Sequence, residues 1–270
     1  MKLGIPFALM GLIATNAFST VVIDDFTTPT TQENHSSQGG QVQWTDNSTA
    51  GSILGDYRDG SVGCELTSED NQVNVKIGTG KFEVTAQPKA GPSIYLSYDG
   101  TAGWSQPADP ENDRFNGTFA SAIDLTDGGA NDRFSFSFAY AFGGKVGPET
   151  VTFNDFKITL LEYDNGTTNT YSYNGGENTA AGGDDTVNTW MTDNYTDLNN
   201  EQSATFEMDF SKFGGASLDD VLALQVHICS ADLGSDYTLN SIAAVPEPAS
   251  AMMIGVVGII GFFIRRRFID

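Results

Sequence analysis

Residues 133–142 read RFSFSFAYAF and alternate between large aromatic and small side chains. A strand points successive side chains to opposite faces, whereas a helix would spread these rings around its circumference. Because only a sheet gathers all the rings on one side, the pattern predicts a strand with one aromatic face. The residues of that face are Phe134, Phe136, Phe138, Tyr140 and Phe142.

Other segments repeat the same two-residue period. Residues 72–78 and 80–87 predict a hairpin around Gly78 to Gly80. Residues 156–173 predict a second hairpin through Asn165-Gly166, because this dipeptide tolerates the positive φ of a tight turn. Further strands are expected at residues 21–26, 93–100, 221–228 and 237–245.

The fold class follows from these strands and from the composition. The chain contains 30 glycines and shows almost no amphipathic helical pattern, which favours turn-rich β structure. We therefore expect an all-β fold, an antiparallel β-sandwich of jelly-roll type, with an up-and-down barrel as the alternative. Residues 174–185, rich in glycine, are expected to form a mobile loop, because no strand and helix flank them as in a phosphate-binding loop.

The charge is strongly acidic. The formal net charge is -22, with 35 acidic residues against 13 lysines and arginines. Such a polyanion repels phosphate backbones, so nucleic acid is excluded as a partner, while loose binding of divalent cations is reasonable. Asp109, Glu111 and Asp113 alternate as oxygen ligands do in calcium loops, although the EF-hand pattern is absent. They are the calcium candidate, and no other metal or cofactor is predicted.

Two cysteines, Cys64 and Cys229, would suffice for one disulfide in an exported protein. Strand parity places Cys64 with Val62 and Leu66, whereas Cys229 falls opposite to its apolar neighbours. One thiol is therefore expected to point inward and the other outward, and the bridge stays an open question.

No catalytic residue is predicted. His35 and His227 adjoin no nucleophile signature, and no Cys-His grouping or four-ligand zinc site is apparent. His35 is expected in a polar loop, and His227 on the solvated side of a sheet beside Gln225 and Cys229. The many carboxylates leave a glycoside hydrolase as the least favoured function, since it needs two of them across a cleft.

Three tryptophans are candidates for stacking on sugar rings. Trp44, Trp104 and Trp190 all lie near polar segments that contain glycine or proline. Exposed rings of this kind bind carbohydrates, while packing in or around the core is the alternative.

The N-terminal residues 1–19 have the layout of a secretory signal peptide. One lysine precedes an apolar stretch that is too short to span a bilayer, and small residues follow it. We expect cleavage after Ser19, with cleavage after Ala17 as the alternative.

The C-terminal residues 249–264 form an uncharged run followed by three arginines. As a helix rising about 1.5 Å per residue it covers about 24 Å, close to the hydrocarbon thickness of a bilayer. Arg265, Arg266 and Arg267 favour the cytoplasm, so the acidic bulk of the chain is expected on the other side of the membrane.

The sequence VPEPAS, the apolar run and the arginine cluster together resemble the PEP-CTERM sorting signal of Gram-negative bacteria. The resemblance implies that Pro246, Glu247 and Pro248 are recognised by a membrane-embedded exosortase, which removes the tail. Flanking prolines hold such a segment extended and are expected to keep it out of helices and sheets. The stretches SILGDYRDGSV, YLSYDG, AIDLTDGGAND and DYTLNSIAAVPEP are similar to pieces of PEP-CTERM passengers, which implies that a first and a last strand pair near the membrane end.

The expected organisation is a signal peptide (1–19), a β-sandwich passenger (20–243) and a sorting signal (244–270). We expect an exported protein with an inner-membrane-tethered intermediate that is released to the cell surface or extracellular matrix. Its role is interpreted as structural or adhesive and non-catalytic. The alternative is a carbohydrate-binding module that recognises exopolysaccharide.

Overall fold

The computed structural model describes residues 20–30, 34–37, 42–48, 52–66, 72–103, 115, 117–142, 151–164, 167–176, 183–194, 198 and 202–246. The predicted signal peptide, the predicted membrane helix and the calcium candidate Asp109, Glu111 and Asp113 lie outside these residues. Within the described ranges, no helix has the length and apolar character needed to cross a membrane.

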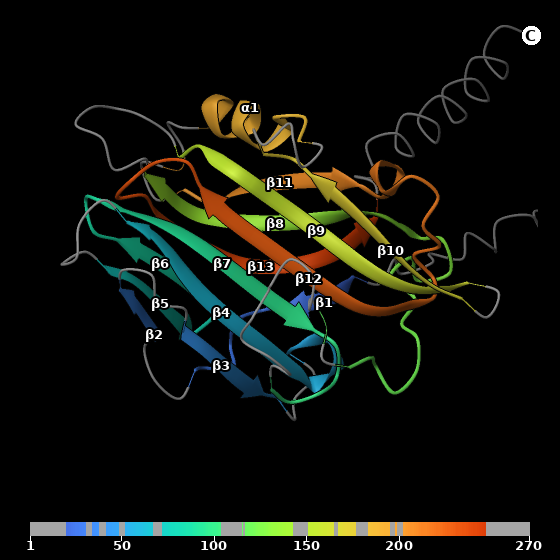
Figure 1. The fold of residues 1–270 in the computed structure, drawn as a ribbon. Helices are drawn as coiled ribbons and strands as arrows, with labels where there is room; N and C mark the ends of the chain where they lie inside the picture. The colour runs from blue at the N-terminus through green and yellow to red at the C-terminus, as the bar shows by residue number, and fades with distance from the viewer. Residues whose placement is uncertain are drawn as a thin grey trace, which may run out of the picture.

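In the described part of the chain, strands form two sheets that face each other (Figure 1). The strands are β1 (Val21–Asp24), β2 (Asn34–Ser37), β3 (Val42–Asn47), β4 (Tyr57–Leu66), β5 (Gln72–Gly78), β6 (Lys81–Ala86), β7 (Ala90–Tyr98), β8 (Asn131–Phe142), β9 (Phe153–Asp164), β10 (Thr167–Asn174), β11 (Ala204–Asp209), β12 (Val221–Ser230) and β13 (Asp236–Pro246). The short helices are η1 (Leu54–Asp56), α1 (Thr186–Asp193) and η3 (Phe210–Phe213).

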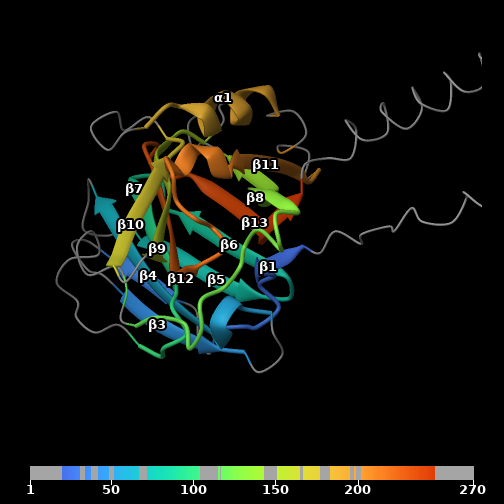
Figure 2. The ribbon, with the colours of Figure 1, turned by 90° about the vertical axis from the view of Figure 1, so that its right-hand side faces the viewer.

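The seven-stranded sheet has the order β11-β8-β13-β6-β5-β2, with β1 also paired to β13. The six-stranded sheet has the order β10-β9-β12-β7-β4-β3. Every pairing between these strands is antiparallel, and Figure 2 shows the two layers side by side. The expectation of an all-β protein built from two antiparallel sheets is confirmed.

The core between the sheets is aromatic. Phe134, Phe136 and Phe138 of β8 are fully buried, as the alternation predicted. Phe136 meets Phe156 of β9 edge to face, with ring centroids 4.8 Å apart. Each buried ring contributes about 2 to 3 kcal/mol through its apolar area, so this cluster is a main source of stability.

The far end of β8 departs from the predicted face. Ala141 is buried there, while Tyr140 and Phe142 are only partly buried. The register between β8 and β13 shifts on both sides of Leu239, where Ala139 of β8 and Asn240 of β13 are each left without a partner in the register. The irregularity at Ala139 exchanges the two faces of β8. The aromatic face therefore ends at Phe138, because a bulge reverses the parity that the sequence pattern carried.

The predicted hairpins are confirmed as strand pairs. β5 pairs with β6, and the residues between them, Thr79 and Gly80, both have positive φ. β9 pairs with β10 from Asp164 and Thr167 onward, which fits a two-residue turn at 165–166. The turn itself lies outside the described residues.

Helix α1 was not expected. It follows the glycine-rich segment and buries Val187 and Met191 against the sandwich. The side chain of Asn188 accepts a hydrogen bond from the backbone N–H of Phe153 at 2.8 Å and donates one to its carbonyl at 3.0 Å. The helix therefore supplies partners to the first residue of β9, which a strand neighbour would otherwise provide.

The first and last strands lie together, as the resemblance implied. Val21 of β1 is paired with Ala244 of β13. β13 continues to Pro246, which stands opposite Asn131 of β8. The first proline of the motif is thus the last residue of a strand, contrary to the expectation that it stays out of a sheet. Proline is tolerated there because the ladder ends.

The two cysteines are separated by β7. The Cα atom of Cys64 on β4 stands opposite Pro92, and that of Cys229 on β12 stands opposite Ser93. Two strand spacings of about 4.8 Å exceed the Cα separation of about 7 Å that a disulfide spans. We therefore expect no bridge between Cys64 and Cys229.

Candidate functional site

The outer face of the six-stranded sheet carries polar side chains on four neighbouring strands. Along β12, Leu224, Val226 and Ile228 point into the core, so the alternate residues Gln225 and His227 point outward. Polar residues occupy the same face on β7, β9 and β4. Those outward residues include Ser93, Tyr95, Ser97, Asp155, Lys157, Thr159, Asp59 and Ser61.

The strand register arranges this face in rows. Cys229 stands between Asp155 of β9 and Ser93 of β7. In the neighbouring row, His227 stands between Lys157 and Tyr95. The two rows place a thiol, an imidazole and a carboxylate on adjacent positions of one surface.

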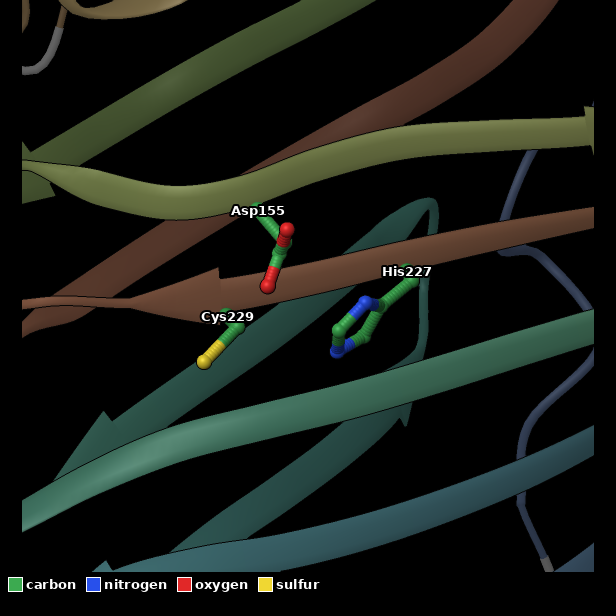
Figure 3. A group of neighbouring side chains, drawn as sticks. All are labelled: Asp155, His227 and Cys229. Atoms are coloured by element: carbon green, nitrogen blue, oxygen red, sulfur yellow. The ribbon is translucent and has the colours of Figure 1, made fainter. Parts of the chain in front are cut away.

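Asp155, His227 and Cys229 converge, and we call them the Asp155 cluster. One potential ligand atom from each residue lies within 4.8 Å of the other two. Among the described residues, this is the group of three or more His, Cys, Asp or Glu side chains that could hold a metal ion. Figure 3 shows the carboxylate of Asp155 reaching from β9 into the space between the other two side chains. His227 and Cys229 are buried and Asp155 is partly buried.

Neighbouring side chains fix the orientation of the cluster. The amide nitrogen of Asn174 donates to Oδ1 of Asp155 at 2.7 Å. The Nε2 atom of His227 lies 3.2 Å from Oγ of Ser93. The ring of Tyr95 stacks on His227 with centroids 4.0 Å apart and planes 2° from parallel. Each flanking contact limits side-chain rotation.

Two expectations about histidine are corrected here. His227 does face outward but is only 8% exposed, because Tyr95 covers one side of its ring. His35 lies on β2, paired with Asn74 of β5, and not in a loop. The sequence placed His227 and Cys229 on one face, since residues two apart on a strand share a face, but did not lead us to interpret His-x-Cys as a pair of metal ligands. The distant Asp155 gave no such signal.

A second polar group lies inside the sandwich. Arg58 of β4 is fully buried and donates to Asp24 at 2.7 Å and to Asp46 at 2.9 and 3.1 Å. The hydroxyl of Tyr98 donates to Asp24 at 3.0 Å, and the indole nitrogen of Trp44 donates to Asp46 at 3.0 Å. We call these five residues the Arg58 network.

Burial dominates the electrostatics of the Arg58 network. It raises the pKa of Asp24 and of Asp46 above the ordinary value, although the charge of Arg58 opposes this. Burial alone would lower the pKa of Arg58, but the facing carboxylates, Asp24 first, raise it and hold the guanidinium charged. All five residues of the network are buried, and their hydrogen bonds connect β1, β3, β4 and β7.

Asp59 lies on the outer face of the six-stranded sheet, and its buried carboxyl group has a raised pKa. Burial raises its pKa to about 6, although hydrogen bonds from Thr45 at 2.5 Å and from the N–H of Gly103 at 3.1 Å oppose the shift. The native state therefore holds a proton that the unfolded chain releases between about pH 4 and about pH 6. This contribution to stability is present at low pH and is lost as the pH rises through about 6.

Asp59→Asn is accordingly expected to stabilise the protein by about 1 to 2 kcal/mol at about pH 7.5, because no buried charge remains. The gain should vanish near pH 4, and urea unfolding at several pH values measures it. Asp124→Asn is the matched control, since hydrogen bonds from Thr126 and Gly128 outweigh burial and lower the pKa of Asp124. That variant should lose stability at neutral pH. A loss at neutral pH in the Asp59 variant would contradict the prediction.

The predicted sugar-binding tryptophans are not gathered into one site. Trp44 is 9% exposed and belongs to the core. Trp190 on α1 is partly buried against Phe138 and Phe206, with ring centroids 5.5 and 5.6 Å away. Trp104 lies outside the described residues, as do Ser19, Glu247, Pro248 and the three arginines.

The chain matches the family model of the PEP-CTERM protein-sorting motif at residues 244–267. It therefore carries this sorting signal, and the resemblance seen in the sequence is confirmed. The match begins at Ala244, inside β13. No curated protein matches the chain.

Among solved structures, the chain is similar to a family 11 carbohydrate-binding module from Clostridium thermocellum in complex with a beta-1,3-1,4-mixed-linked tetrasaccharide. The identity is 12% and the TM-score 0.33, over 85% of this chain and 97% of that one. For a solution structure of CtCBM11, the identity is 10% and the TM-score 0.34, over 87% of this chain and 99% of that one. For a family 12 glycoside hydrolase, the identity is 12% and the TM-score 0.31, over 77% of this chain and 100% of that one. Similarity at this level bears on neither binding nor catalysis.

Proposed function

We propose that this chain is an exported β-sandwich protein that an exosortase sorts through its C-terminal signal. An intermediate is tethered to the inner membrane by residues 249–264, and the product reaches the cell surface or extracellular matrix. There it acts without catalysis as a structural or adhesive component. The observation that carries the proposal is the PEP-CTERM motif at 244–267, which continues directly from β13.

The geometry of the sandwich supports such a tether. Val21 and Ala244 are paired, so the points where residues 1–19 and 247–270 join the sandwich lie side by side. Only Glu247 and Pro248 separate the end of β13 from the proposed membrane helix. The folded domain would therefore stand close to the bilayer until the tail is removed. Four of the 13 lysines and arginines lie in the two removed segments, so the released product is strongly acidic, which favours its solubility.

Glu247→Ala is the test, and it should abolish processing because the Pro-Glu-Pro step loses its only charged group. Intact-mass measurement of the protein from a strain with an active exosortase should then show the uncut tail, retained in the membrane fraction. Glu83→Ala, which changes a glutamate on β6, is the control and should be processed normally. The proposal fails if Glu247→Ala and an exosortase-deficient strain both yield the same released product as the unchanged chain.

A second candidate function is recognition of exopolysaccharide. It is favoured by the polar groups on the outer face of the six-stranded sheet, where Nε2 of Gln225 donates to Oγ of Ser97 at 2.9 Å beside the Tyr95 ring. These three side chains are at most 9% exposed, so a sugar reaches them only if this face opens. Hydroxyl, amide and aromatic groups together are what a sugar ring needs for orientation and stacking. Retention of the released product on the organism's own polymer would support this candidate, and free passage would remove it.

A further inference from the structure

The outer face of the six-stranded sheet brings together three different metal-binding groups. Cys229 and His227 come from β12, and Asp155 comes from the opposite position on β9. Their ligand atoms lie within 4.8 Å of one another. A tetrahedral zinc ion holds its ligand atoms about 3.5 Å apart, given bonds of about 2.0 to 2.3 Å. Binding of an ion would therefore draw the three ligand atoms closer together than they lie without it.

Side chains around the cluster hydrogen-bond to these ligands and fix their orientation, as the residues that support metal ligands do in known sites. Asn174 donates to Oδ1 of Asp155, which fixes the plane of that carboxylate. When Nε2 of His227 donates its proton to Ser93, Nδ1 is the unprotonated nitrogen and lies on the side of the ring facing Asp155 (Figure 3). The stacked ring of Tyr95 keeps the imidazole from turning.

We propose that Asp155, His227 and Cys229 bind a divalent transition metal ion, with zinc as the ion that fits best. A thiolate, an imidazole nitrogen and a carboxylate oxygen form a mixed set that zinc accepts, with water in the fourth position. Calcium and magnesium prefer sites made only of oxygen, and the sulfur and nitrogen of this site disfavour them. Binding converts the Cys229 thiol to a thiolate, and the displaced proton passes to solvent.

The test uses the full chain, purified in detergent and titrated with Co²⁺ and then with Zn²⁺. Co²⁺ bound to a thiolate gives an intense charge-transfer absorption in the near ultraviolet, and Zn²⁺ should displace it at one ion per chain. Cys229→Ser should lose this absorption completely, whereas Cys64→Ser, the matched control, should keep it. Asn174→Ala should weaken binding by about 10-fold while keeping the absorption, because it removes the hydrogen bond that supports Asp155 and leaves the three ligands in place. Oδ1 of Asn174 also accepts from the N–H groups of Phe156 and Gly176, so circular dichroism checks that this variant is folded.

A second measurement covers the case in which Cys229→Ser fails to fold. Asp155→Asn is close in size to the original residue, and circular dichroism checks that it is folded. Zn²⁺ should raise the thermal midpoint of the unchanged chain and leave that of Asp155→Asn unchanged. The proposal is overturned if the unchanged chain shows no thiolate absorption with Co²⁺, if the absorption is lost in Cys64→Ser and kept in Cys229→Ser, or if Asp155→Asn responds to Zn²⁺ like the unchanged chain.

Discussion

Arg58→Met should lower the free energy of unfolding by about 3 to 5 kcal/mol at neutral pH. The substitution fills a similar volume but removes the only cation that contacts Asp24 and Asp46 within the Arg58 network. Both carboxylates would remain in the core without a compensating charge. A loss of this size is a large part of the 5 to 15 kcal/mol that typically separates a folded domain from its unfolded chain.

Urea unfolding followed by circular dichroism measures this loss, and Arg133→Met is the matched control. Arg133 lies near the edge of the seven-stranded sheet and pairs with Glu207 and Asp132, whose side chains are partly exposed to water. Removing a solvated pair of this kind costs about 0 to 1 kcal/mol. Equal losses of unfolding free energy in the two variants would contradict the prediction, because removing the buried cation would then destabilise the protein no more than removing a solvated one.

The pH dependence gives the Arg58 prediction a second readout. Without the guanidinium, the pKa of the Asp24 carboxyl rises further, because the attraction that opposed burial is gone. The native variant then binds more protons than its unfolded chain, so its stability should increase as the pH falls toward 4. The deficit relative to the unchanged protein should therefore shrink in acid, and Asp46→Asn combined with Arg58→Met should recover part of it.

The strands were the part of the fold that the sequence predicted best. Alternation is a local property, and Phe134, Phe136 and Phe138 are buried together as their spacing required. The exchange of faces after Phe138 could not be predicted, because the bulge depends on the register against β13. Helix α1 was missed for a similar reason, since Asn188 bonds both backbone groups of Phe153 on β9 in addition to Asp185 in its own segment.

The site was harder to predict than the fold because its members are far apart in sequence. His227 and Cys229 share a face by parity, but only the pairing of β12 with β9 brings Asp155 to them. The Arg58 network joins β1, β3, β4 and β7 in the same way. Residue type was also a poor guide at Trp44, whose ring was a sugar-binding candidate but is buried in the core.

Gly60→Ala should destabilise the protein by about 3 kcal/mol, the upper end of the usual cost of overpacking by one methyl group. A Cβ atom at Gly60 would lie 2.0 Å from carbons of the Trp44 ring, far inside van der Waals contact. The Trp44 ring cannot move away without breaking a hydrogen bond, because its indole nitrogen donates to Asp46. Asp46 is itself fixed by hydrogen bonds from Arg58. The added methyl would therefore strain the Arg58 network as well as the packing of β3 on β4.

Gly63→Ala on the same strand is the matched control for Gly60→Ala. Its Cβ atom would meet the carbonyl oxygen of Ser93 at 3.6 Å, an ordinary contact. It should change the urea midpoint little, since strand propensity alone is worth under about 1 kcal/mol. If Trp44→Leu is added to Gly60→Ala, the clash is relieved, and the double variant should be more stable than the sum of the two single losses predicts. Additive losses would mean that the glycine is required for its backbone and not for the space that Trp44 occupies.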